Sequence, residues 1–398
     1  MIQRKEYLDK LIAWQGKHVI KVVTGIRRCG KSRLLQLYQG YLLSQDIDKS
    51  QIVAIDFENM DNEHLCDRKV LHKYVLDQYS PGKTLYVFLD EIQNVPEFEK
   101  CVNSLYLRED LDIYITGSNA FFLSGELATH LSGRYITIEM LPLSFAEYVN
   151  FTGNSDNLAR KYLEYTTRSS FPYVTELGGN EKNIEDYLHG IYSTIVLKDI
   201  TQRYKFADTM QLQRILKYCY SNISNLISIK SIADTMTSSG HKIDVKTVEK
   251  YLSAFIGSYI LYQAKRYDIR GKQHLKTLEK YYATDIGLRF MLLGRKNQDT
   301  GYILENIVYL ELLRRDFEVF VGKVGDAEVD FVAVNSKGTT YIQVSASVRD
   351  QTTRERELSS LRSINDHYPK ILLTLDDDPD VDYDGIMQHN VLDWLINK

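Results

Sequence analysis

Residues 25–32, Gly-Ile-Arg-Arg-Cys-Gly-Lys-Ser, constrain the fold of this chain more than any other segment. They match the spacing G-x4-G-K-[ST] of a phosphate-binding loop, or P-loop. A short β-branched run at 18–24 precedes them, and apolar residues at helical spacing follow from 34 to 38. This order of strand, loop and helix is the setting that a P-loop requires, because loop N–H groups and the positive end of the helix dipole both face the phosphate. The sequence therefore predicts a nucleotide site here.

Each residue type in the P-loop has a chemical reason to be there. The two glycines let the backbone turn so that its N–H groups point at phosphate oxygens. Lys31 can reach the β- and γ-phosphates, and the Ser32 hydroxyl can bind Mg²⁺. The residues that we expect to contact the nucleotide are Gly25, Ile26, Arg27, Arg28, Cys29, Gly30, Lys31, Ser32 and Arg33.

Two adjacent carboxylates provide a second chemical signal. The apolar run that begins at residue 84 ends in Asp90 and Glu91. In P-loop ATPases this Walker B position holds an acid that binds magnesium directly or through water. A second carboxylate can polarise the attacking water as a general base. We therefore predict that Asp90 holds Mg²⁺ and that Glu91 is the catalytic base. The alternative is a strand that simply ends at a solvated acidic turn.

Two further strand ends carry candidate catalytic residues. The run 112–116 leads into Ser118 and Asn119, and a polar side chain here can reach the γ-phosphate and orient the water. We predict Asn119 for this role, with Ser118 as the other candidate. Arg134, at the entrance of the strand 135–138, could act as an arginine finger within its own subunit or on a neighbouring one. The alternatives are an ordinary loop and a surface arginine.

Strand-like and helical segments alternate through the first third of the chain. The strand-like runs are 18–24, 51–57, 84–91, 112–116 and 135–138. This alternation predicts an α/β fold, with a parallel sheet, flanking helices and the nucleotide at the carboxyl ends of the strands.

Four segments together resemble a known family over about residues 18–150. GIRRCGKS, YVFLDEIQ, YITGSNA and LSGRYITIEMLPLSFAEY are similar to segments of AAA-type ATPases of the archaeal-ATPase branch. In that family they are Walker A, Walker B with its catalytic glutamate, sensor 1, and a G-R motif followed by P-L-S-F. The resemblance implies ATP and Mg²⁺ as cofactors and ATP hydrolysis as the activity. It leaves open which hydroxyl or amide of sensor 1 acts.

The middle of the chain has the pattern of helices followed by a winged-helix-like segment. Residues 157–210 have helical spacing, and the apolar stretch 191–200 could pack on the ATPase domain as a lid. Two short helices at 229–236 and 244–252, then an alternating stretch at 259–283, predict a helix-turn-helix with a wing hairpin. This segment is basic through Lys242, Lys246, Lys250, Lys265, Arg266, Arg270 and Lys272. These residues could contact DNA phosphates, or the segment could serve only as a packing module.

The last hundred residues predict a restriction-nuclease-like domain. A helix with Glu305 and strands with Asp330 and Gln343 follow the order of a core in which two acids hold magnesium and a lysine positions water. Resemblance to the uncharacterised C-terminal domain often fused to these ATPases, over about 150–398, supports this interpretation. Gln343 and Ser345 stand where an acid and a lysine are expected. We therefore predict a degenerate site, with a structural or DNA-docking role favoured over cleavage.

Length and composition limit the class of protein. The 398 residues exceed one hydrophobic core. The predicted domains are 1–150 (AAA-type P-loop ATPase), 151–208 (helical lid or linker), 209–295 (winged-helix-like) and 296–398 (nuclease-like). A net charge of −4 argues against a globally basic nucleic-acid binder. The four cysteines form no C-x-x-C pair, which argues against a zinc site. No apolar run approaches about 18 residues, so we expect a cytoplasmic protein with no membrane partner.

The leading functional hypothesis is ATP hydrolysis that drives a DNA-binding or protein-binding C-terminal half. It admits a homo-oligomer in which Arg134 acts on a neighbour's nucleotide. A second hypothesis is a nucleotide-gated regulatory module with negligible turnover. The third is an ATP-regulated, metal-dependent nuclease, and the residues at 343 and 345 count against it.

Overall fold

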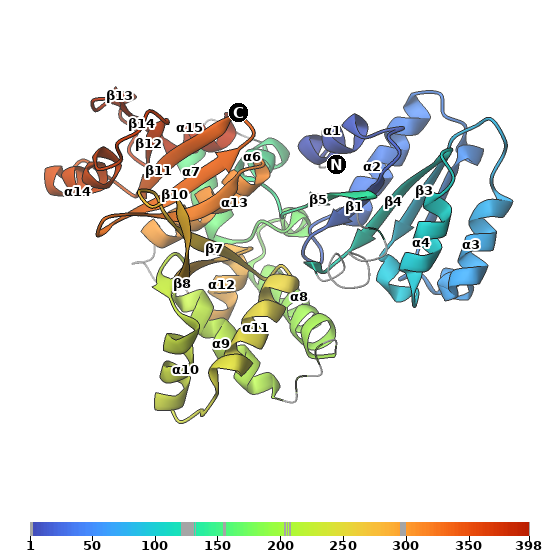
Figure 1. Ribbon diagram of the computed structural model, residues 1–398, viewed down its shortest axis with the longest axis horizontal. Helices are drawn as coiled ribbons and strands as arrows, with labels where there is room; N and C mark the ends of the chain where they lie inside the picture. Colours follow the sequence, from blue (N-terminus) through green and yellow to red (C-terminus); the bar gives the residue numbers. More distant parts are fainter. Residues whose placement is uncertain are drawn as a thin grey trace. The chain divides into compact units, whose positions relative to one another are not determined.

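A computed structural model describes residues 3–120, 131, 133–153, 157–202, 204, 206, 208–294 and 300–397 (Figure 1). Contacts within the chain divide it into two units. The first contains the residues up to Pro142 together with Gly257–Tyr259, and the second contains Leu143–Ile256 and the chain from Ile260 onward. The predicted boundary at residue 150 lies near the start of the second unit.

Five parallel strands form the sheet of the first unit, in the order β2-β3-β4-β1-β5. They are β1 (Ile20–Thr24), β2 (Ile52–Asp56), β3 (Leu85–Asp90), β4 (Leu111–Gly117) and β5 (Tyr135–Glu139). The helices that flank them are α1 (Lys5–Ala13), α2 (Lys31–Ser44), α3 (Arg68–Asp77) and α4 (Phe98–Tyr106) (Figure 1). The predicted α/β fold is confirmed, and each of the five predicted strands forms.

The residue types of the central strands explain their position. β1, β3 and β4 are buried along their whole length. Their apolar, partly β-branched sequences are typical of parallel strands that are covered on both faces. Val22, Val87 and Ile115 of these strands belong to one core with Leu105 of α4. Because the strands are parallel, the segments that follow β1, β3 and β4 emerge at the same edge of the sheet.

A buried ion pair links β1 and β4 near their amino ends. Lys21 and Asp112 form the pair, and both side chains are almost completely buried. The Lys21 ammonium also donates to the carbonyl oxygen of Lys17 at 2.7 Å. The second carboxylate oxygen of Asp112 accepts hydrogen bonds from the Tyr114 hydroxyl and the Gly16 N–H, both at 2.9 Å. Burial lowers the pKa of Lys21, and the Asp112 carboxylate opposes that shift.

Nine strands form the sheet of the second unit, in the order β13-β14-β12-β11-β10-β9-β7-β8-β6. They are β6 (Leu226–Ile227), β7 (Leu261–Asp268), β8 (Gln273–Ala283), β9 (Glu318–Val324), β10 (Ala327–Asn335), β11 (Gly338–Ser345), β12 (Lys370–Thr374), β13 (Val381–Asp382) and β14 (Ile386–Asn390). The pairs β11–β12 and β12–β14 are parallel, whereas β9–β10 and β10–β11 are antiparallel hairpins.

Helices make up most of the rest of the second unit. They are α6 (Phe145–Thr152), α7 (Leu158–Thr167), α8 (Glu181–Ser193), α9 (Thr209–Ser221), α10 (Ile229–Ser238), α11 (Val245–Gly257), α12 (Ile286–Leu293), α13 (Thr300–Arg314), α14 (Gln351–Arg362) and α15 (Val391–Ile396). A π-helix, Thr194–Gln202, continues α8. None of the helices in the described part of the chain combines the length and hydropathy needed to cross a lipid bilayer.

The predicted wing hairpin is part of the large sheet. β7 and β8 pair antiparallel as a hairpin, and α9, α10 and α11 gather beside it (Figure 1). β7 also pairs in parallel with β9, through residues 266–268 and 321–323. Since β7 has a hydrogen-bonded neighbour on each side, the sheet continues from the predicted domain 209–295 into the predicted domain 296–398.

Candidate active site

The P-loop connects the carboxyl end of β1 to the start of α2. Gly25 has a φ of 139°, and a Cβ there would lie 2.1 Å from the carbonyl oxygen of Met140. Gly30, immediately before α2, has a φ of 106°. Both values lie in the region that favours glycine, because a side chain would strain the backbone there. The two glycines of the sequence motif are therefore required by the local geometry.

Replacing Gly25 by alanine is expected to lower the free energy of unfolding by about 1–3 kcal/mol and to weaken nucleotide binding. The reason is that the new methyl group would overlap the Met140 carbonyl oxygen and displace the loop. Urea denaturation and nucleotide titration measure the two effects. Gly40→Ala is the matched control, because Gly40 lies within α2 and has no atom within 4 Å of an added Cβ. Equal results for both variants would contradict this account.

Lys31 lies beneath the loop that it belongs to. Its Nζ donates to the carbonyl oxygens of Gly25 at 3.1 Å and Ile26 at 3.4 Å. The same Nζ donates to Ser118 Oγ at 3.0 Å and lies 3.5 Å from Glu91 Oε1. The Ser118 hydroxyl in turn donates to Glu91 Oε1 at 2.6 Å. The structure thus brings together one side chain from the P-loop, one that follows β3 and one that follows β4.

Asp90, the last residue of β3, is contacted by two hydroxyl groups. Thr116 of the neighbouring strand β4 donates to its Oδ1. Ser32, at the start of α2, also hydrogen-bonds to the Asp90 carboxyl. Burial raises the pKa of Asp90, and the two hydroxyl groups oppose that shift. Ser32 and Asp90, the two predicted metal ligands, are therefore neighbours. A serine hydroxyl and a carboxylate are hard oxygen donors of the kind that Mg²⁺ prefers.

Glu91 follows β3 with a left-handed backbone, at a φ of 52°. Its N–H donates to Thr116 Oγ1 at 2.8 Å, and the side-chain amide of Gln93 donates to its Oε2. Burial is the largest single influence and opposes ionisation. The Lys31 charge and the hydrogen bonds from Ser118 and Gln93 outweigh it and hold the pKa of Glu91 below its ordinary value. Glu91 is therefore a buried carboxylate at neutral pH, which is the state that a general base requires.

The other residues of the P-loop differ in their surroundings. Arg27 forms an ion pair with Glu58, with 2.8 Å between nitrogen and oxygen. Arg28 and Arg33 are exposed. Cys29 is fully buried, and burial raises the pKa of its thiol. Since the thiolate is the reactive form, Cys29 is poorly suited to redox chemistry at neutral pH.

Arg4 contacts the P-loop from a segment that the sequence motifs do not single out. It is buried at the start of α1 and donates to the carbonyl oxygens of Cys29, at 3.2 Å, and Leu141. The Tyr7 ring centre lies 4.8 Å from its guanidinium carbon, and the Tyr7 hydroxyl accepts the Leu141 N–H at 3.1 Å. The start of α1 thereby connects the P-loop to the segment after β5. Nothing in the local sequence around Arg4 indicates these contacts.

The two remaining predicted catalytic residues, Asn119 and Arg134, lie at opposite ends of the parallel strands. Asn119 is buried in the loop after β4, at the carboxyl end of the parallel strands, where the P-loop also follows β1. Arg134 precedes β5, and its carbonyl oxygen accepts the N–H of Ile20 at the start of β1. Its guanidinium donates to the Asn103 side chain and lies 5.4 Å from the Tyr106 ring centre. The structure does not bring Arg134 to its own P-loop, so only its action on a neighbouring subunit stays a prediction.

The second unit brings together the residues of the predicted nuclease-like site. Lys280 of β8 lies between Glu305 of α13 and Asp330 of β10, with its Nζ 2.8 Å from Glu305 Oε1 and 3.5 Å from Asp330 Oδ1. Gln343 of β11 accepts the N–H of Asp330 at 3.2 Å and donates to Glu357 of α14 at 2.8 Å. The helix and the two strands are therefore neighbours, as their order in the sequence suggests.

Lys280 is the member of this cluster that the sequence analysis does not expect. The expected lysine position on β11 holds Ser345, but β8 supplies an ammonium group that also lies 2.8 Å from Glu328. Burial raises the pKa of Glu305 to about 8, and the Lys280 charge opposes that shift. Among the residues that the structure describes, no three His, Cys, Asp or Glu side chains are arranged to hold a metal ion.

The basic residues of the winged-helix-like segment form two groups. Lys242, Lys246 and Lys250 are exposed before and along α11. Lys265, Arg266, Arg270 and Lys272 lie on the β7–β8 hairpin and its turn, and all except Arg266 are exposed. The winged-helix interpretation and its DNA contacts stay predictions.

Comparisons with known proteins agree with the geometry of the first unit. Residues 17–149 match a family described as AAA domain, and residues 159–299 match a domain of unknown function, DUF8612. The Walker-type ATPase PABY2304 of Pyrococcus abyssi superposes with a TM-score of 0.53, covering 73% of this chain and 96% of its own at 16% identity. This likeness shows a shared fold.

Two relatives extend along most of the chain. An uncharacterized protein of Haemophilus influenzae is 38% identical over 400 residues, which is 100% of this chain and 99% of the relative. The uncharacterized protein MJ1544 of Methanocaldococcus jannaschii is 30% identical over 364 residues, 86% of this chain and 77% of the relative. The names of both relatives leave their activity open.

Proposed function

We propose that this protein hydrolyses ATP. The chain belongs to the same family as its Haemophilus influenzae and Methanocaldococcus jannaschii relatives. Its residues 17–149 match a AAA domain. The observation that carries the proposal is the buried contact among Lys31, Ser118 and Glu91. A cation, a hydroxyl and a carboxylate from three segments meet at the carboxyl edge of a parallel sheet. This edge is where α/β folds bind their ligands.

The residues present fit a magnesium–nucleotide complex. The positive φ angles of Gly25 and Gly30 let the loop turn so that its backbone N–H groups would face the phosphates. Lys31 and the loop N–H groups would hold the β- and γ-phosphates. Ser32 and Asp90 would hold Mg²⁺, which supplies positive charge to the phosphate oxygens.

Glu91 is proposed to accept the proton of the attacking water. Ser118 and Gln93 orient its carboxylate, each through a hydrogen bond to a different oxygen. In this structure the Lys31 ammonium group stabilises the negative charge of Glu91. The γ-phosphate would compete with Glu91 for the same ammonium group. ATP binding would therefore raise the basicity of Glu91, because a nearby positive charge is what stabilises its ionised form.

The proposal extends to a partner of the C-terminal half, either DNA or a protein. The exposed lysines at 242, 246 and 250 support a phosphate-binding surface there.

The proposal also extends to a homo-oligomer in which Arg134 reaches the nucleotide of a neighbouring subunit. Sedimentation of the purified chain with and without ATP tests this part, since a monomer that hydrolyses ATP at full rate would exclude the role of Arg134.

Lys31→Ala is expected to abolish detectable phosphate release and to weaken ATP binding at least about tenfold, because the loop loses the charge that faces the phosphates. Phosphate release and ATP titration on the purified chain measure this. Lys49→Ala, an exposed lysine in the same unit, is the matched control and should behave as the unmodified chain does. Turnover that persists in Lys31→Ala would overturn the assignment. Tight ATP binding without phosphate release by the unmodified chain would favour the nucleotide-gated module.

A further inference from the structure

A ligand-sized hollow lies in the second unit. Its volume is about 830 Å³, and it is formed by the β7–β8 hairpin, the strands β9, β10 and β11, and the segment after α14. Pockets of this size typically hold small organic ligands. We refer to this hollow as the aromatic pocket, because five rings line it: Tyr267, His274, Phe320, Tyr341 and Tyr368.

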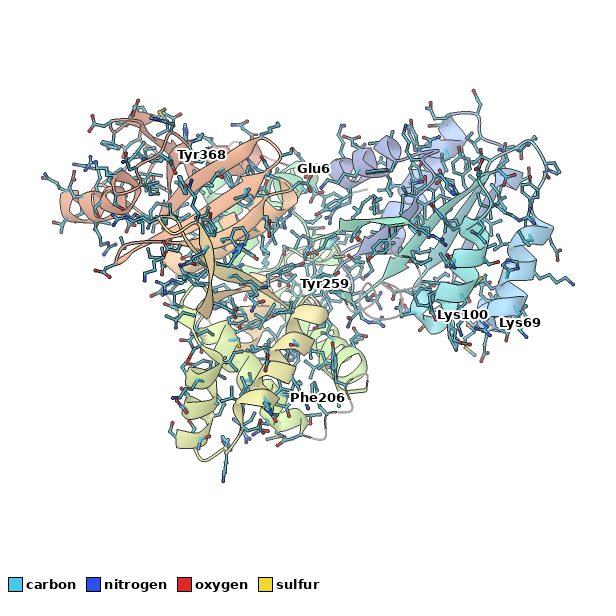
Figure 2. The ribbon with its side chains drawn as sticks, in the orientation of Figure 1. Glu6, Lys69, Lys100, Phe206, Tyr259 and Tyr368 are labelled. Carbon is cyan, nitrogen blue, oxygen red and sulfur yellow. The ribbon has the colours of Figure 1, made fainter. Side chains whose placement is uncertain are left out.

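The five rings come from four separate segments and form two groups. Tyr267 and His274 of the hairpin lie with Phe320 of β9, at ring-centre distances of 5.4 Å, 5.9 Å and 4.9 Å. Tyr341 of β11 and Tyr368 after α14 form the other group, at 6.3 Å. Figure 2 labels Tyr368, whose side chain lies beside the large sheet of the second unit. Tyr368 is 49% exposed. Partly exposed ring faces are the surfaces on which a planar ligand can stack.

The floor of the aromatic pocket is rigid. Phe320, Val332 and Tyr341 are buried and belong to one hydrophobic core with Leu361 of α14. The Tyr341 hydroxyl donates to Asp366 at 2.7 Å, which fixes the orientation of that ring. A ligand would therefore meet preformed surfaces, and little conformational entropy would be lost on binding.

Cationic side chains stand at the open side of the aromatic pocket. Arg270 and Lys272 occupy the turn of the β7–β8 hairpin and are exposed, and His274 follows them. Within the described part of the chain, neither Arg270 nor Lys272 has an ion-pair partner. Two acids also line the pocket, Asp366, which accepts the Tyr341 hydroxyl, and Glu318, at the exposed start of β9, so an anionic group would bind beside Arg270 and Lys272 and away from these carboxylates. Stacking faces beside exposed cations suit a ligand that has both a planar ring and an anionic group.

We propose that the aromatic pocket binds a nucleotide, with the base against the partly exposed rings of Tyr267, His274 and Tyr368 and the phosphate at Arg270 and Lys272. The nucleotide is either a free mononucleotide or an unpaired residue of a nucleic-acid strand, because both present the same chemistry. This site is distinct from the P-loop, and its occupancy does not require ATP hydrolysis.

The test uses the full-length chain with Lys31→Ala, so that the P-loop contributes as little as possible. Adenosine monophosphate and a short fluorescent oligodeoxyadenylate are titrated separately, by calorimetry and by fluorescence anisotropy. Replacing Tyr368 by alanine is expected to weaken binding about 5- to 150-fold, the range found when a stacking aromatic residue is removed. Tyr173→Ala is the matched control, since Tyr173 is also 49% exposed but lies outside the pocket.

The charged rim has its own test. The double variant Arg270→Ala/Lys272→Ala is expected to reduce the salt dependence of oligonucleotide binding by about 1.4 in the slope of log K against log salt. Lys182→Ala/Lys337→Ala removes two exposed lysines of the second unit that do not line the pocket, and should leave the slope unchanged. If the two double variants change the slope equally, Arg270 and Lys272 do not bind the strand and the proposal is wrong.

The two ligands separate the two sources of the nucleotide. Tyr368-dependent binding of the monophosphate, with no gain for the oligonucleotide, supports a mononucleotide site. Much tighter Tyr368-dependent binding of the oligonucleotide supports a strand site. Absence of binding by both ligands, or equal results for Tyr368→Ala and Tyr173→Ala, would overturn the proposal. ATP turnover by the unmodified chain is measured separately, so failure here would leave the ATPase assignment standing.

Discussion

Replacing Glu91 by glutamine is expected to slow ATP hydrolysis about 10²- to 10⁴-fold while ATP still binds. Glutamine has the shape of glutamate and can keep a hydrogen bond to Ser118, but it cannot accept a proton from water. The loss should therefore appear in the chemical step. Single-turnover phosphate release measures that step, and titration with ATP measures binding in the same variant.

Glu58→Gln is the matched control for this prediction. Glu58 also carries a carboxylate next to the P-loop, where it pairs with Arg27, but its side chain is 42% exposed. Removing an exposed charge usually has a small effect, so turnover should stay within about threefold of the unmodified chain. If Glu91→Gln and Glu58→Gln lower turnover equally, Glu91 is not the base.

Asp112→Ala is expected to lower the free energy of unfolding of the first unit by about 3–5 kcal/mol. The change leaves the Lys21 ammonium buried with no carboxylate to compensate it, and also removes the acceptor of the Tyr114 hydroxyl. Urea denaturation of the full chain, followed by a signal from the first unit, gives the midpoint. The site residues lie at the carboxyl ends of the strands, away from this pair. The nucleotide affinity, measured without urea, should therefore change little.

Two variants control the Asp112 prediction. The double variant Lys21→Met/Asp112→Ala removes the stranded charge and should recover part of the lost stability. Asp9→Ala breaks the Lys5–Asp9 pair, in which both side chains are more than half exposed, and should have little effect. An Asp112→Ala midpoint equal to that of Asp9→Ala would show that the buried pair contributes little.

The parts of the fold and site that follow from the sequence are those with a local signal. The P-loop occupies eight consecutive residues, and Asp90 and Glu91 stand at the end of an apolar strand-like run, so spacing alone identifies them. The parallel order of strands then predicts that Asn119 or Ser118 meets them at one end of the sheet, and in the structure Ser118 contacts both Lys31 and Glu91. Thr116, which contacts both acids, has no such signal, because a threonine in a strand is ordinary.

The parts that could not be predicted depend on contacts between distant segments. Arg4 reaches Cys29 and Leu141 only because α1 packs against the P-loop. A segment that contains α12 separates Lys280 from Glu305 in the sequence. Only the folded chain brings β8 next to α13. Arg134 precedes β5, which runs parallel to β1, so it lies at the end of the strands opposite the P-loop, and its role as an arginine finger on a neighbouring subunit stays a prediction.

The pairing of β7 with β9 limits where the C-terminal half can be cut into fragments, and which segment can be exchanged between genes as a unit. The family match of the middle region ends at residue 299, but the sheet continues across that point. A fragment cut there would expose unpaired N–H and C=O groups along β7 or β9, and such open edges favour aggregation. We therefore expect that genetic exchange preserves Leu226 to Asn390 as one piece, and that a soluble fragment of this half must keep both sides of the junction.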